Sequence, residues 1–364
     1  MEYVRAILVL GGLLGGLSAV LLLLQRVLLP VRPCTIDVND GRRVLEVETR
    51  QTLLEALYNA EIFIPSGCGG TAVCGACTAT VLSGGGPVLP TESPHLTPDQ
   101  IARSVRLACC VRLRGDVCAR IDPAWFDVRR YKARVAAARM LTRDTREIRI
   151  ELADPPSFAH GPGQYVQVEA PAADGLAPRA YSISSAAGRV ERFEIVVKLV
   201  PGGAGSTYLH SVRPGDTVWF TGPYGDFRLL EDPGGRLVCV AGGCGLGAVK
   251  GIVETVLERT PRRPVRVFAG VRTSDDAFYR DHFERLAARH RNLEVIYACS
   301  QARRGAPSGP GDAGMIHEVV QRRLAPGEAQ QAYICGPPPM VDATAAVLRQ
   351  KGLPPHAIHA DAYG

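Results

Sequence analysis

The sequence predicts a multidomain chain with an N-terminal transmembrane helix, a small α+β domain, an antiparallel β-barrel and a doubly wound α/β domain. Residues 6–24 carry no charge, strand-like patterns with little helical signal fill 129–230, and strands alternate with helices from 236 onward. With 364 residues, the chain is long enough for several domains. We place the four parts at 1–30, 33–126, 129–230 and 234–364. The net charge of +6 is too small and too dispersed for a nucleic-acid binder.

The first part is predicted to be a membrane anchor. As a helix, the nineteen residues Ala6–Leu24 would span about 30 Å, which is one hydrocarbon core. A cleaved signal peptide is the alternative, but its apolar core would be shorter, and a small-x-small cleavage site should stand where this chain has Gln25–Pro30. Only Arg5 precedes the span, whereas four arginines follow it: Arg26, Arg32, Arg42 and Arg43. We therefore expect a single-pass protein with its soluble domains in the cytoplasm.

The predicted α+β domain starts with two short strands, Thr35–Val38 and Leu45–Val47, and a helix over Thr52–Ala60. A loop rich in glycine and cysteine follows, then a polar segment that contains prolines. The domain ends near Phe126. Strands and helices mixed within fewer than about 100 residues indicate one small compact module.

The two larger parts differ in their periodicity. Strands of the barrel are predicted at Glu147–Leu152, Gln164–Val168, Phe193–Val197 and Val218–Phe220. Beyond residue 236, the predicted order is strand Leu237–Ala241, helix Val249–Leu257, strand Val265–Ala269, helix Asp281–Ala288 and strand Leu293–Ala298. Such alternation favours a parallel, doubly wound sheet.

Four cysteines indicate a metal cluster. Cys68, Cys74 and Cys77 lie in a glycine-rich loop, and 31 residues separate Cys77 from Cys109. Four thiolates suit a [2Fe-2S] cluster, and glycines let the backbone wrap around it and point amides at its sulfurs. A structural zinc site is the alternative, but zinc spacing usually pairs two short C-x2-C units.

Two further cysteines compete for the role of fourth ligand. Cys110 is adjacent to Cys109, and Cys118 is near. Neighbouring residues of a strand point to opposite faces, so Cys109 and Cys110 should not both bind the cluster. The spacing alone does not choose between them.

Three stretches together resemble the electron-input subunit, designated F, of the sodium-translocating NADH:quinone oxidoreductase. They are the cysteine loop with five residues between Cys68 and Cys74, the segment Gly84–Glu92, and Arg106–Cys109. The resemblance covers nearly the entire chain, to Tyr363-Gly364. It implies a ferredoxin-like β-grasp fold for 33–126 and makes Cys109 the fourth ligand. It also implies a bacterial inner membrane, other membrane subunits of a respiratory complex as partners, and quinone as an indirect acceptor.

The segment Arg179-Ala180-Tyr181-Ser182 is similar to the flavin motif of the ferredoxin-NADP reductase superfamily, which implies that 129–230 binds FAD. Arg179 can neutralise the FAD pyrophosphate, Tyr181 can face the isoalloxazine, and Ser182 can hydrogen-bond near the ring. An arginine beside a half-buried tyrosine on a barrel strand is the alternative. A second phosphate contact is expected near a helix N-terminus, with added charge from a lysine, at Ser206, Thr207 and Lys198.

The glycine turn at Gly243, Cys244 and Gly245 follows a predicted strand and opens a helix, so it can bring a pyrophosphate to free amides. In the superfamily this is the nicotinamide-binding turn, although Ala248 stands where proline is usual. The resemblance extends to a Cys-Gly-Pro-Pro motif and a C-terminal aromatic, represented here by Cys335, Gly336, Pro337 and Tyr363. It implies that Cys335 lies beside the nicotinamide and that Tyr363 covers the flavin until nicotinamide displaces it.

The choice of nucleotide depends on Gly270–Asp276. Arg272 is accompanied by Asp275 and Asp276, which would repel the 2′-phosphate of NADPH. We therefore expect NADH, although Arg303 and Arg304 in the loop 301–314 could serve a phosphate.

Taken together, these resemblances imply a membrane-anchored subunit that moves electrons from NADH to FAD, to a [2Fe-2S] cluster and to a membrane acceptor. The reductase component of a multicomponent oxygenase, built from the same parts, is the main alternative. Between Ala170 and Arg179 the chain is short where the sodium-pump subunit commonly carries an insertion, which keeps that alternative open. A non-catalytic iron-sulfur scaffold or sensor is a third hypothesis, and the intact flavin and nicotinamide motifs argue against it.

Overall fold

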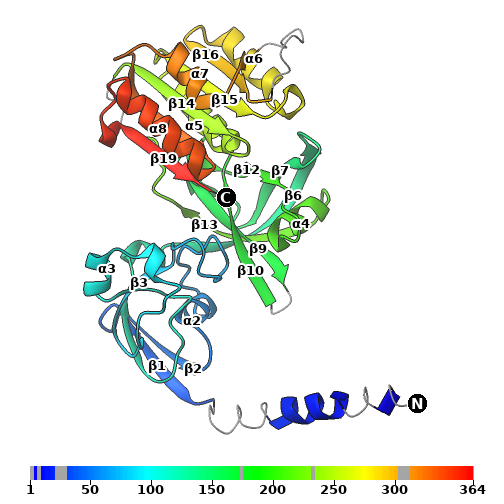
Figure 1. Ribbon diagram of the computed structural model, residues 1–364, viewed down its shortest axis with the longest axis vertical. Helices are drawn as coiled ribbons and strands as arrows, with labels where there is room; N and C mark the ends of the chain where they lie inside the picture. The colour runs from blue at the N-terminus through cyan, green and yellow to red at the C-terminus, as the bar shows by residue number, and fades with distance from the viewer. Residues whose placement is uncertain are drawn as a thin grey trace. The chain divides into compact units, whose positions relative to one another are not determined.

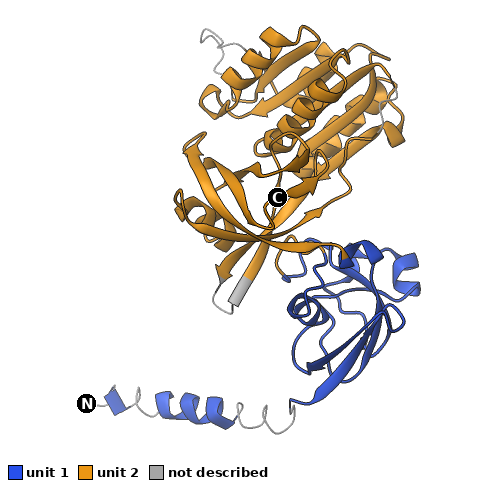
Figure 2. Cartoon of the chain, turned by 180° about the vertical axis from the view of Figure 1, so that it is seen from behind, with its two compact units in different colours: residues 1–64, 70–126 blue, residues 65–69, 127–364 orange. Residues whose placement is uncertain are grey.

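The computed structural model describes residues 4–5, 10–20, 31–172, 175–230, 234–301 and 311–363. The chain divides into two compact units, coloured separately in Figure 2. Unit 1 comprises 1–64 and 70–126. Unit 2 comprises 127–364 together with the five residues Pro65–Gly69.

The N-terminal segment is helical over residues 10–20. The anchor predicted for Ala6–Leu24 lies partly outside the described residues. Among the residues that are described, no helix has both the length and the apolar character needed to cross a membrane. The transmembrane helix therefore stays a prediction.

Unit 1 contains a five-stranded sheet in the order β2-β1-β5-β3-β4. Its central pair, β1 and β5, is parallel, and the other pairs are antiparallel. The strands are β1 (Pro33–Val38), β2 (Arg43–Glu48), β3 (Thr78–Ser83), β4 (Val105–Leu107) and β5 (Val117–Arg120). The helices are α2 (Leu53–Asn59) and α3 (Pro98–Ala102), with 3-10 turns η1 (Ser93–His95) and η2 (Pro123–Phe126).

Helix α2 begins at a capping box. The Thr52 hydroxyl accepts from Glu55 N, and the Glu55 carboxylate accepts from Thr52 N, so both amides are satisfied at the helix start. Leu53 and Leu57, spaced one turn apart, are both fully buried in the core of unit 1. This helix precedes the cysteine loop and fixes where that loop begins.

The first part of unit 2 is a six-stranded antiparallel sheet in the order β10-β9-β13-β6-β7-β12. A bridge between Ile183 and Ile195 joins the end of β10 to β12, so the sheet closes into a barrel. Its strands are β6 (Arg129–Met140), β7 (Thr145–Asp154), β9 (Tyr165–Ala172), β10 (Gly175–Ser182), β12 (Arg192–Lys198) and β13 (Thr217–Tyr224). A small ladder of β8 (Phe158–His160) and β11 (Gly188–Val190) and one helix, α4 (Ala204–Ser211), complete it.

Aromatic side chains fill the barrel. Phe220 stacks on Tyr131 with ring centroids 5.0 Å apart. Phe158 and Phe193 each meet the Phe220 ring edge-on. These pairs combine burial with favourable ring geometry. The barrel core therefore does not depend on a bound ligand for its filling.

The second part of unit 2 is a parallel sheet in the order β17-β16-β15-β14-β18-β19. Its strands are β14 (Arg236–Gly242), β15 (Val265–Val271), β16 (Leu293–Cys299), β17 (Asp312–Ala313), β18 (Ala329–Gly336) and β19 (Ile358–Ala362). The chain runs outward from β14 to β17 and then returns to β18 on the other side of β14. The carboxyl ends of β14 and β18 thus flank a topological switch point, where such folds bind ligands.

Helices cover both faces of this sheet (Figure 1). Side chains of α5 (Gly245–Arg259) and α6 (Arg280–Arg289) share one apolar core with Leu237 and Cys239 of β14. Side chains of α7 (Ile316–Arg323) and α8 (Pro338–Gln350) share another with Val238 and Val240. Alternate residues of β14 thus face opposite cores, which is why the strand is apolar throughout. The 3-10 turns η3 (Ser274–Asp276) and η4 (Pro355–Ala357) complete unit 2.

All the predicted strands and helices of the soluble region are confirmed. The sequence patterns missed further elements, among them β3, β4, β5 and α3 of unit 1 and β6, β19, α7 and α8 of unit 2. They placed no helix in the barrel apart from the helix N-terminus expected near Ser206. The loop predicted over Gln301–Gly314 lies largely outside the described residues, and its last part contributes β17.

Candidate functional site

The four predicted cluster ligands fall in two groups. Cys74, Cys77 and Cys109 belong to unit 1, whereas Cys68 belongs to the segment Pro65–Gly69 of unit 2. The thiols of Cys77 and Cys109 are both buried and hydrogen-bond to each other. That contact raises the pKa of Cys109 in the protein without iron, with burial adding to the effect. Two of the four predicted ligands are therefore already adjacent.

The expectation that Cys109 and Cys110 point to opposite faces, as neighbours in a strand do, is wrong. Residues 108–110 form a turn after β4, so the alternation of a strand does not apply, and the two sulfurs lie 3.8 Å apart. Cys109 nevertheless has the stronger position, because it is the one that meets Cys77. Cys110 faces Thr91 instead, 3.9 Å from its hydroxyl.

A buried ion pair holds the approach to Cys109. The Arg106 guanidinium lies 2.6 Å from a Glu92 carboxylate oxygen, and both side chains are nearly inaccessible. Arg106 also donates to the carbonyls of Gly85, Gly86 and Pro87, while the Glu92 carboxylate accepts from Leu107 N. Burial alone would raise the pKa of Glu92, but these hydrogen bonds hold it below its ordinary value. The ion pair and these hydrogen bonds thus connect Gly84–Glu92 with Arg106–Cys109, two of the three segments that resemble the sodium-pump subunit.

The donor chemistry fits a [2Fe-2S] cluster, since cysteine thiolates are its usual ligands. Within the described part of the chain, no three His, Cys, Asp or Glu side chains already stand together as a metal-binding group. The loop does have the flexible backbone that ligation needs, because Gly69, Gly70 and Gly75 all adopt positive φ angles. The assignment of all four ligands stays a prediction.

The predicted flavin residues lie on β10. Arg179 and Tyr181 both face Gly205 at the start of α4, where a Cβ atom would stand 2.6 Å from Arg179 Cγ and 2.6 Å from the Tyr181 hydroxyl. Burial raises the pKa of Tyr181 to about 12, so this ring stays neutral. No carboxylate among the described residues pairs with Arg179, whose guanidinium donates only to Pro178 O. A half-buried, unpaired guanidinium fits the pyrophosphate of FAD.

The other four predicted flavin contacts are placed differently. The Ser206 hydroxyl donates to the carbonyls of Val200 and Gly203 and accepts from Val200 N, so it builds the turn before α4. Thr207 is exposed in the first turn of that helix. Lys198 lies 3.6 Å from Asp144 and lines the cavity near Cys244, away from the contacts of Arg179. Ser182, at the end of β10, is half-buried.

A cavity of about 260 Å³ lies at the switch point. Its walls come from the ends of β14, β15 and β16, from the start of α8 and from the β6–β7 turn. The predicted site residues that line it are Lys198, Gly243, Cys244, Arg272, Asp276 and Pro337. Residues that the motifs did not reveal also line it, among them Arg143, Asp144, Phe278, Ser300 and Met340. They come from separate segments, and only the folded chain brings them together.

The C-terminal Tyr363 closes the glycine turn. Its hydroxyl donates to Gly242 O at 2.6 Å and accepts from Gly245 N. Helix α5 has no side-chain cap from its own N-cap residue, Cys244, so Tyr363 supplies that capping contact. Burial raises the pKa of Tyr363. The position predicted for a nucleotide phosphate is thus held by a neutral hydroxyl.

Cys335 is the next-to-last residue of β18 and is fully buried. Its thiol lies 3.8 Å from the Asp361 carboxylate, and burial together with this carboxylate raises the pKa of Cys335 well above its ordinary value. A neutral thiol suits positioning better than reaction. Gly245 approaches so closely that an added Cβ would lie 2.2 Å from Cys335 O. Gly336 is likewise enclosed, by the Met340 side chain.

Asp276 and Arg272 stand at the β15 end of the cavity. The Asp276 carboxylate accepts from Thr273 N at 3.0 Å and from the Thr273 hydroxyl at 2.8 Å. These two hydrogen bonds hold the carboxylate at a fixed place on the cavity wall. Such a carboxylate disfavours a 2′-phosphate and can accept from a ribose hydroxyl.

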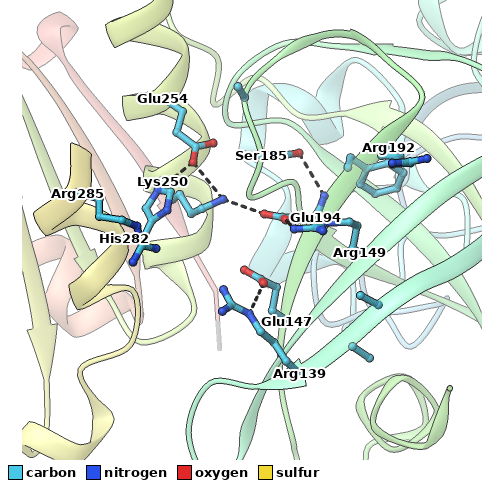
Figure 3. Close-up of a pocket in the computed structure, with 14 residues that line it drawn as sticks. Arg139, Glu147, Arg149, Ser185, Arg192, Glu194, Lys250, Glu254, His282 and Arg285 are labelled. Atoms are coloured by element: carbon cyan, nitrogen blue, oxygen red, sulfur yellow. Dashed lines mark hydrogen bonds and ion pairs between the residues drawn. The ribbon is translucent and has the colours of Figure 1, made fainter. Parts of the chain in front are cut away.

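Unit 2 contains a second, larger cavity of about 770 Å³, which the motifs did not reveal (Figure 3). Lys250 of α5 lies at its centre, with its ammonium 2.9 Å from Glu194 and 3.2 Å from Glu254. His282 Nε2 lies 3.0 Å from Glu254, without the geometry of a hydrogen bond. Charged residues scattered over separate strands and helices carry no sequence motif that could have announced this cavity.

Sequence models of three domain families match the chain. The 2Fe-2S iron-sulfur cluster binding domain matches 36–114, the oxidoreductase FAD-binding domain matches 132–229, and the oxidoreductase NAD-binding domain matches 239–346. These segments fall within the ranges 33–126, 129–230 and 234–364. They show that the cofactors are a [2Fe-2S] cluster, FAD and NADH, as predicted.

Known proteins similar to the chain include reductase components of oxygenases and a subunit of a sodium-translocating quinone reductase. The chain is 34% identical over 325 residues to the reductase component of phenol 2-monooxygenase from a Pseudomonas species, with 86% of this chain and 90% of the relative covered. It is 28% identical to the subunit designated F of the Na(+)-translocating NADH-quinone reductase from Neisseria meningitidis, with both chains covered completely. The crystal structure of the Amycolatopsis cytochrome P450 reductase GcoB matches with a TM-score of 0.70 and 30% identity, covering 90% of this chain and 98% of that one.

These similarities reach across all three soluble domains, in the same order and over nearly the whole length of the relatives. The resemblance to the sodium-pump subunit alone was therefore too narrow, because oxygenase reductases are equally close. The chain belongs to the ferredoxin reductase-type family of oxidoreductases, in which a [2Fe-2S] domain is joined to an FAD-binding barrel and an NAD-binding domain.

Proposed function

We propose that this protein is the NADH-oxidising, electron-input subunit of a membrane complex, like the corresponding subunit of the sodium-translocating NADH:quinone reductase. The observation that carries the proposal is the uncharged segment Ala6–Leu24 ahead of the three redox domains. Alignment with the Neisseria subunit over the whole of both chains supports it. Its partners would be the other membrane subunits, with quinone reached indirectly through them.

The cofactors supply the redox chemistry, since FAD accepts two electrons as a hydride and releases them singly to an iron-sulfur cluster. The residues of this chain bind and orient. Arg179 neutralises the pyrophosphate of FAD, and the turn Gly243–Gly245 admits the nucleotide. Cys335 is neutral and buried, so it shapes the place where the nicotinamide lies. No acid or base is required of the protein in this scheme.

The proposed location is the bacterial inner membrane, with a single span and the redox domains in the cytoplasm. The arginines that follow the span support this orientation. Cell fractionation tests it with a variant that lacks residues 6–24. We expect the full chain in the membrane fraction and the shortened chain in the soluble fraction. Full-length protein in the soluble fraction would overturn the anchor.

A second candidate function is the reductase component of a multicomponent oxygenase. The 34% identity to the phenol 2-monooxygenase reductase favours it, as does the short connection between Ala170 and Arg179. In that case the electron acceptor would be an oxygenase component rather than a membrane subunit. The cofactor order within the chain would be the same.

Purification from native membranes distinguishes the two functions. We expect other membrane subunits to accompany the chain, and expect NADH to bleach the flavin and reduce the cluster. Co-purification with an oxygenase component, and electron delivery to it, would favour the second function. Absence of iron and labile sulfide from anaerobic preparations would contradict both.

The cluster ligands can be tested directly. Cys109→Ala should abolish the paramagnetic resonance signal of the reduced cluster, because that thiol is buried beside Cys77. Cys110→Ala is the matched control, and its signal should remain. The opposite pattern would make Cys110 the ligand.

Preference for NADH over NADPH is part of the proposal. The fixed carboxylate of Asp276 lines the cavity and would repel a 2′-phosphate. We expect kcat/KM for NADH to exceed that for NADPH, and Asp276→Asn to narrow the difference. Equal use of both nucleotides by the parent protein would contradict this.

A further inference from the structure

The first residues of the cysteine loop are attached to the barrel of unit 2. Pro65–Gly69 belongs to that unit, although the rest of the loop belongs to unit 1. A Cβ at Gly67 would lie 3.3 Å from Ala180 Cβ, and a Cβ at Gly69 would lie 2.9 Å from Pro178 O. Both neighbours are on β10, the strand that carries Arg179 and Tyr181. At Gly69, whose φ is also positive, no side chain fits this close against the strand, and at Gly67 a side chain would be in tight contact.

One polar side chain fixes this segment. The amide of Ser66 donates to Oε1 of Gln167, and both residues are buried, with 4% and 3% of their surfaces exposed. Gln167 lies on β9, directly opposite Ala180 of β10. The side chain of a glutamine buried in a barrel strand needs hydrogen-bond partners. Here one partner is in the segment Pro65–Gly69, which is not part of the barrel sheet.

The Gln167 side chain is itself held in place. It hydrogen-bonds to the Tyr224 hydroxyl, which donates to Thr221 Oγ1 at 2.8 Å. Tyr224 is almost fully buried and belongs to β13, the neighbour of β9 on its other side. Since Tyr224 uses its own hydrogen on Thr221, the Gln167 amide group donates to it and Oε1 is left to face Ser66. The acceptor therefore has one orientation.

The Ser66 hydroxyl adds a second observation. Its oxygen is buried and has no hydrogen-bond partner among the described residues. Ser66 stands two positions before Cys68 and one strand away from the flavin motif. A buried polar atom of this kind is satisfied when a bound group or water lies against it. The backbone of the segment is thus held by Gln167, while the Ser66 hydroxyl still lacks a partner in the described part of the chain.

We propose that Gln167 is a positioning residue for electron transfer between the flavin and the cluster. By binding the Ser66 amide, it fixes the Cys68-bearing end of the loop against β10, the strand that binds the flavin. The inference rests on the proposed ligand role of Cys68. One electron passes at a time, and no bond forms or breaks in the protein. Misplacement by about 1 Å can cost a rate about 100-fold, so one hydrogen bond can matter.

Rapid mixing of the holoenzyme with NADH, without oxygen, tests the proposal. Gln167→Leu keeps the size of the side chain but removes the acceptor. We expect flavin reduction at the parental rate and cluster reduction slowed by about tenfold or more. Hydrogen exchange at the amides of residues 65–69 should rise, because their anchor is lost.

Two further variants make the result decisive. Gln167→Asn is polar but one methylene too short, so it should slow cluster reduction as Gln167→Leu does. Gln330→Leu is the matched control, because Gln330 Oε1 also accepts one backbone amide, from Arg236, at 2.6 Å. The proposal would be overturned if Gln167→Leu and Gln167→Asn both reduced the cluster at the parental rate. It would also be overturned if Gln330→Leu slowed cluster reduction equally, or if both Gln167→Leu and Gln167→Asn lost their cofactors. A parent protein without flavin or iron would instead contradict the proposed function.

Discussion

The two cavities of unit 2 use opposite means to shape an open space. The smaller one, at the switch point, is bounded by glycines and by the ends of strands, with a volume of about 260 Å³. The larger one, of about 770 Å³, is bounded by charged side chains from β6, β7, β12, α5 and α6. In the first, the main chain comes close to the open space. In the second, long side chains cross it.

The pairing of charges favours the smaller cavity over the larger one as the predicted nucleotide site. In the larger cavity, Glu194 meets both Lys250 and Arg149, and Glu147 meets Arg139 at 2.7 Å (Figure 3). Its carboxylates are therefore already neutralised by neighbours, and a ligand would have to break these pairs. In the smaller cavity, the start of α5 is capped by one removable hydroxyl, that of Tyr363. This preference follows from the pairing of charges and not from the volume, which is greater in the charged cavity.

The largest expected effect comes from adding a side chain at Gly245, where the backbone lies closest to Cys335 beside the smaller cavity. Gly245→Ala would place a Cβ 2.2 Å from Cys335 O and 2.6 Å from its carbonyl carbon, and neither backbone atom can move freely. We expect flavin reduction by NADH to fall by more than about 100-fold. Chemical reduction of the flavin by dithionite should still occur. Rapid mixing with each reductant measures both.

The control is Gly115→Ala. Nothing lies within 4 Å of a Cβ at Gly115, and its φ is not in the left-handed region. This variant should behave as the parent. If Gly245→Ala reduced its flavin as quickly as the parent, close backbone approach would not be what shapes the nicotinamide site.

The next largest effect concerns the charged cavity. Lys250 is 5% exposed, and Lys250→Met would leave Glu194 and Glu254 facing each other without the ammonium between them. Breaking a buried ion network in this way costs about 3–5 kcal/mol. We expect that loss in the free energy of unfolding, measured in urea, with the rate of flavin reduction by NADH unchanged in the folded protein.

Arg192→Met tests the rim of the same cavity. Its side chain is 62% exposed and pairs with Glu151, so its loss should cost less than about 1 kcal/mol. If Lys250→Met instead weakened nucleotide binding and left stability intact, the larger cavity would be a functional site, and the comparison would fail.

These two regions also differ in how far the sequence reveals them. The glycine turn at Gly243–Gly245 and the end of β18 at Cys335 are local patterns, so a motif finds both, and strand order brings them together. Glu147, Glu194 and Lys250 are ordinary charged residues in three separate elements, and their meeting depends on how barrel and sheet pack. Gln167 was missed for the same reason, since its partner Ser66 is 101 positions away in sequence.

Other differences have local causes. Cys109 and Cys110 were assigned to a strand, but β4 ends at Leu107 and a turn follows, which brings both sulfurs to one side. Ser206 fits a phosphate contact by sequence, yet its hydroxyl is used by Val200 and Gly203. The Ser206 hydroxyl thus found its partners within a few residues, which periodicity cannot foresee.

Lowering the pH should remove the stabilisation that the Glu194 carboxylate gains in the larger cavity. Burial would raise the pKa of Glu194, but the ammonium of Lys250 beside it brings that pKa below its ordinary value. The stabilisation is thus present above about pH 4.3, the ordinary value for glutamate, and is lost as the pH falls through the lower, folded value. We expect the parent to lose more stability than Glu194→Gln between pH 5 and pH 3, as estimated roughly from that ordinary value.

Urea unfolding at a series of pH values measures this. Other carboxylates with lowered pKa values, such as Glu92 and Asp144, contribute equally to both proteins. Only the difference between the two curves therefore reports on Glu194. Parallel curves would show that Lys250 does not stabilise the Glu194 carboxylate.

The smallest expected effect is a change in nucleotide affinity on removal of the Tyr363 hydroxyl. The Tyr363 hydroxyl occupies Gly245 N, an amide that a phosphate at the start of α5 would need. Tyr363→Phe removes that competitor while keeping the ring. If the competing hydrogen bond contributes about 1 kcal/mol, NAD+ should bind about fivefold more tightly. Calorimetric titration measures the change, and Tyr297→Phe, which loses a hydroxyl bond to Phe278 O at 3.1 Å, should leave it at the parental value. Weaker binding to Tyr363→Phe would mean that the hydroxyl serves the nucleotide rather than holding its place.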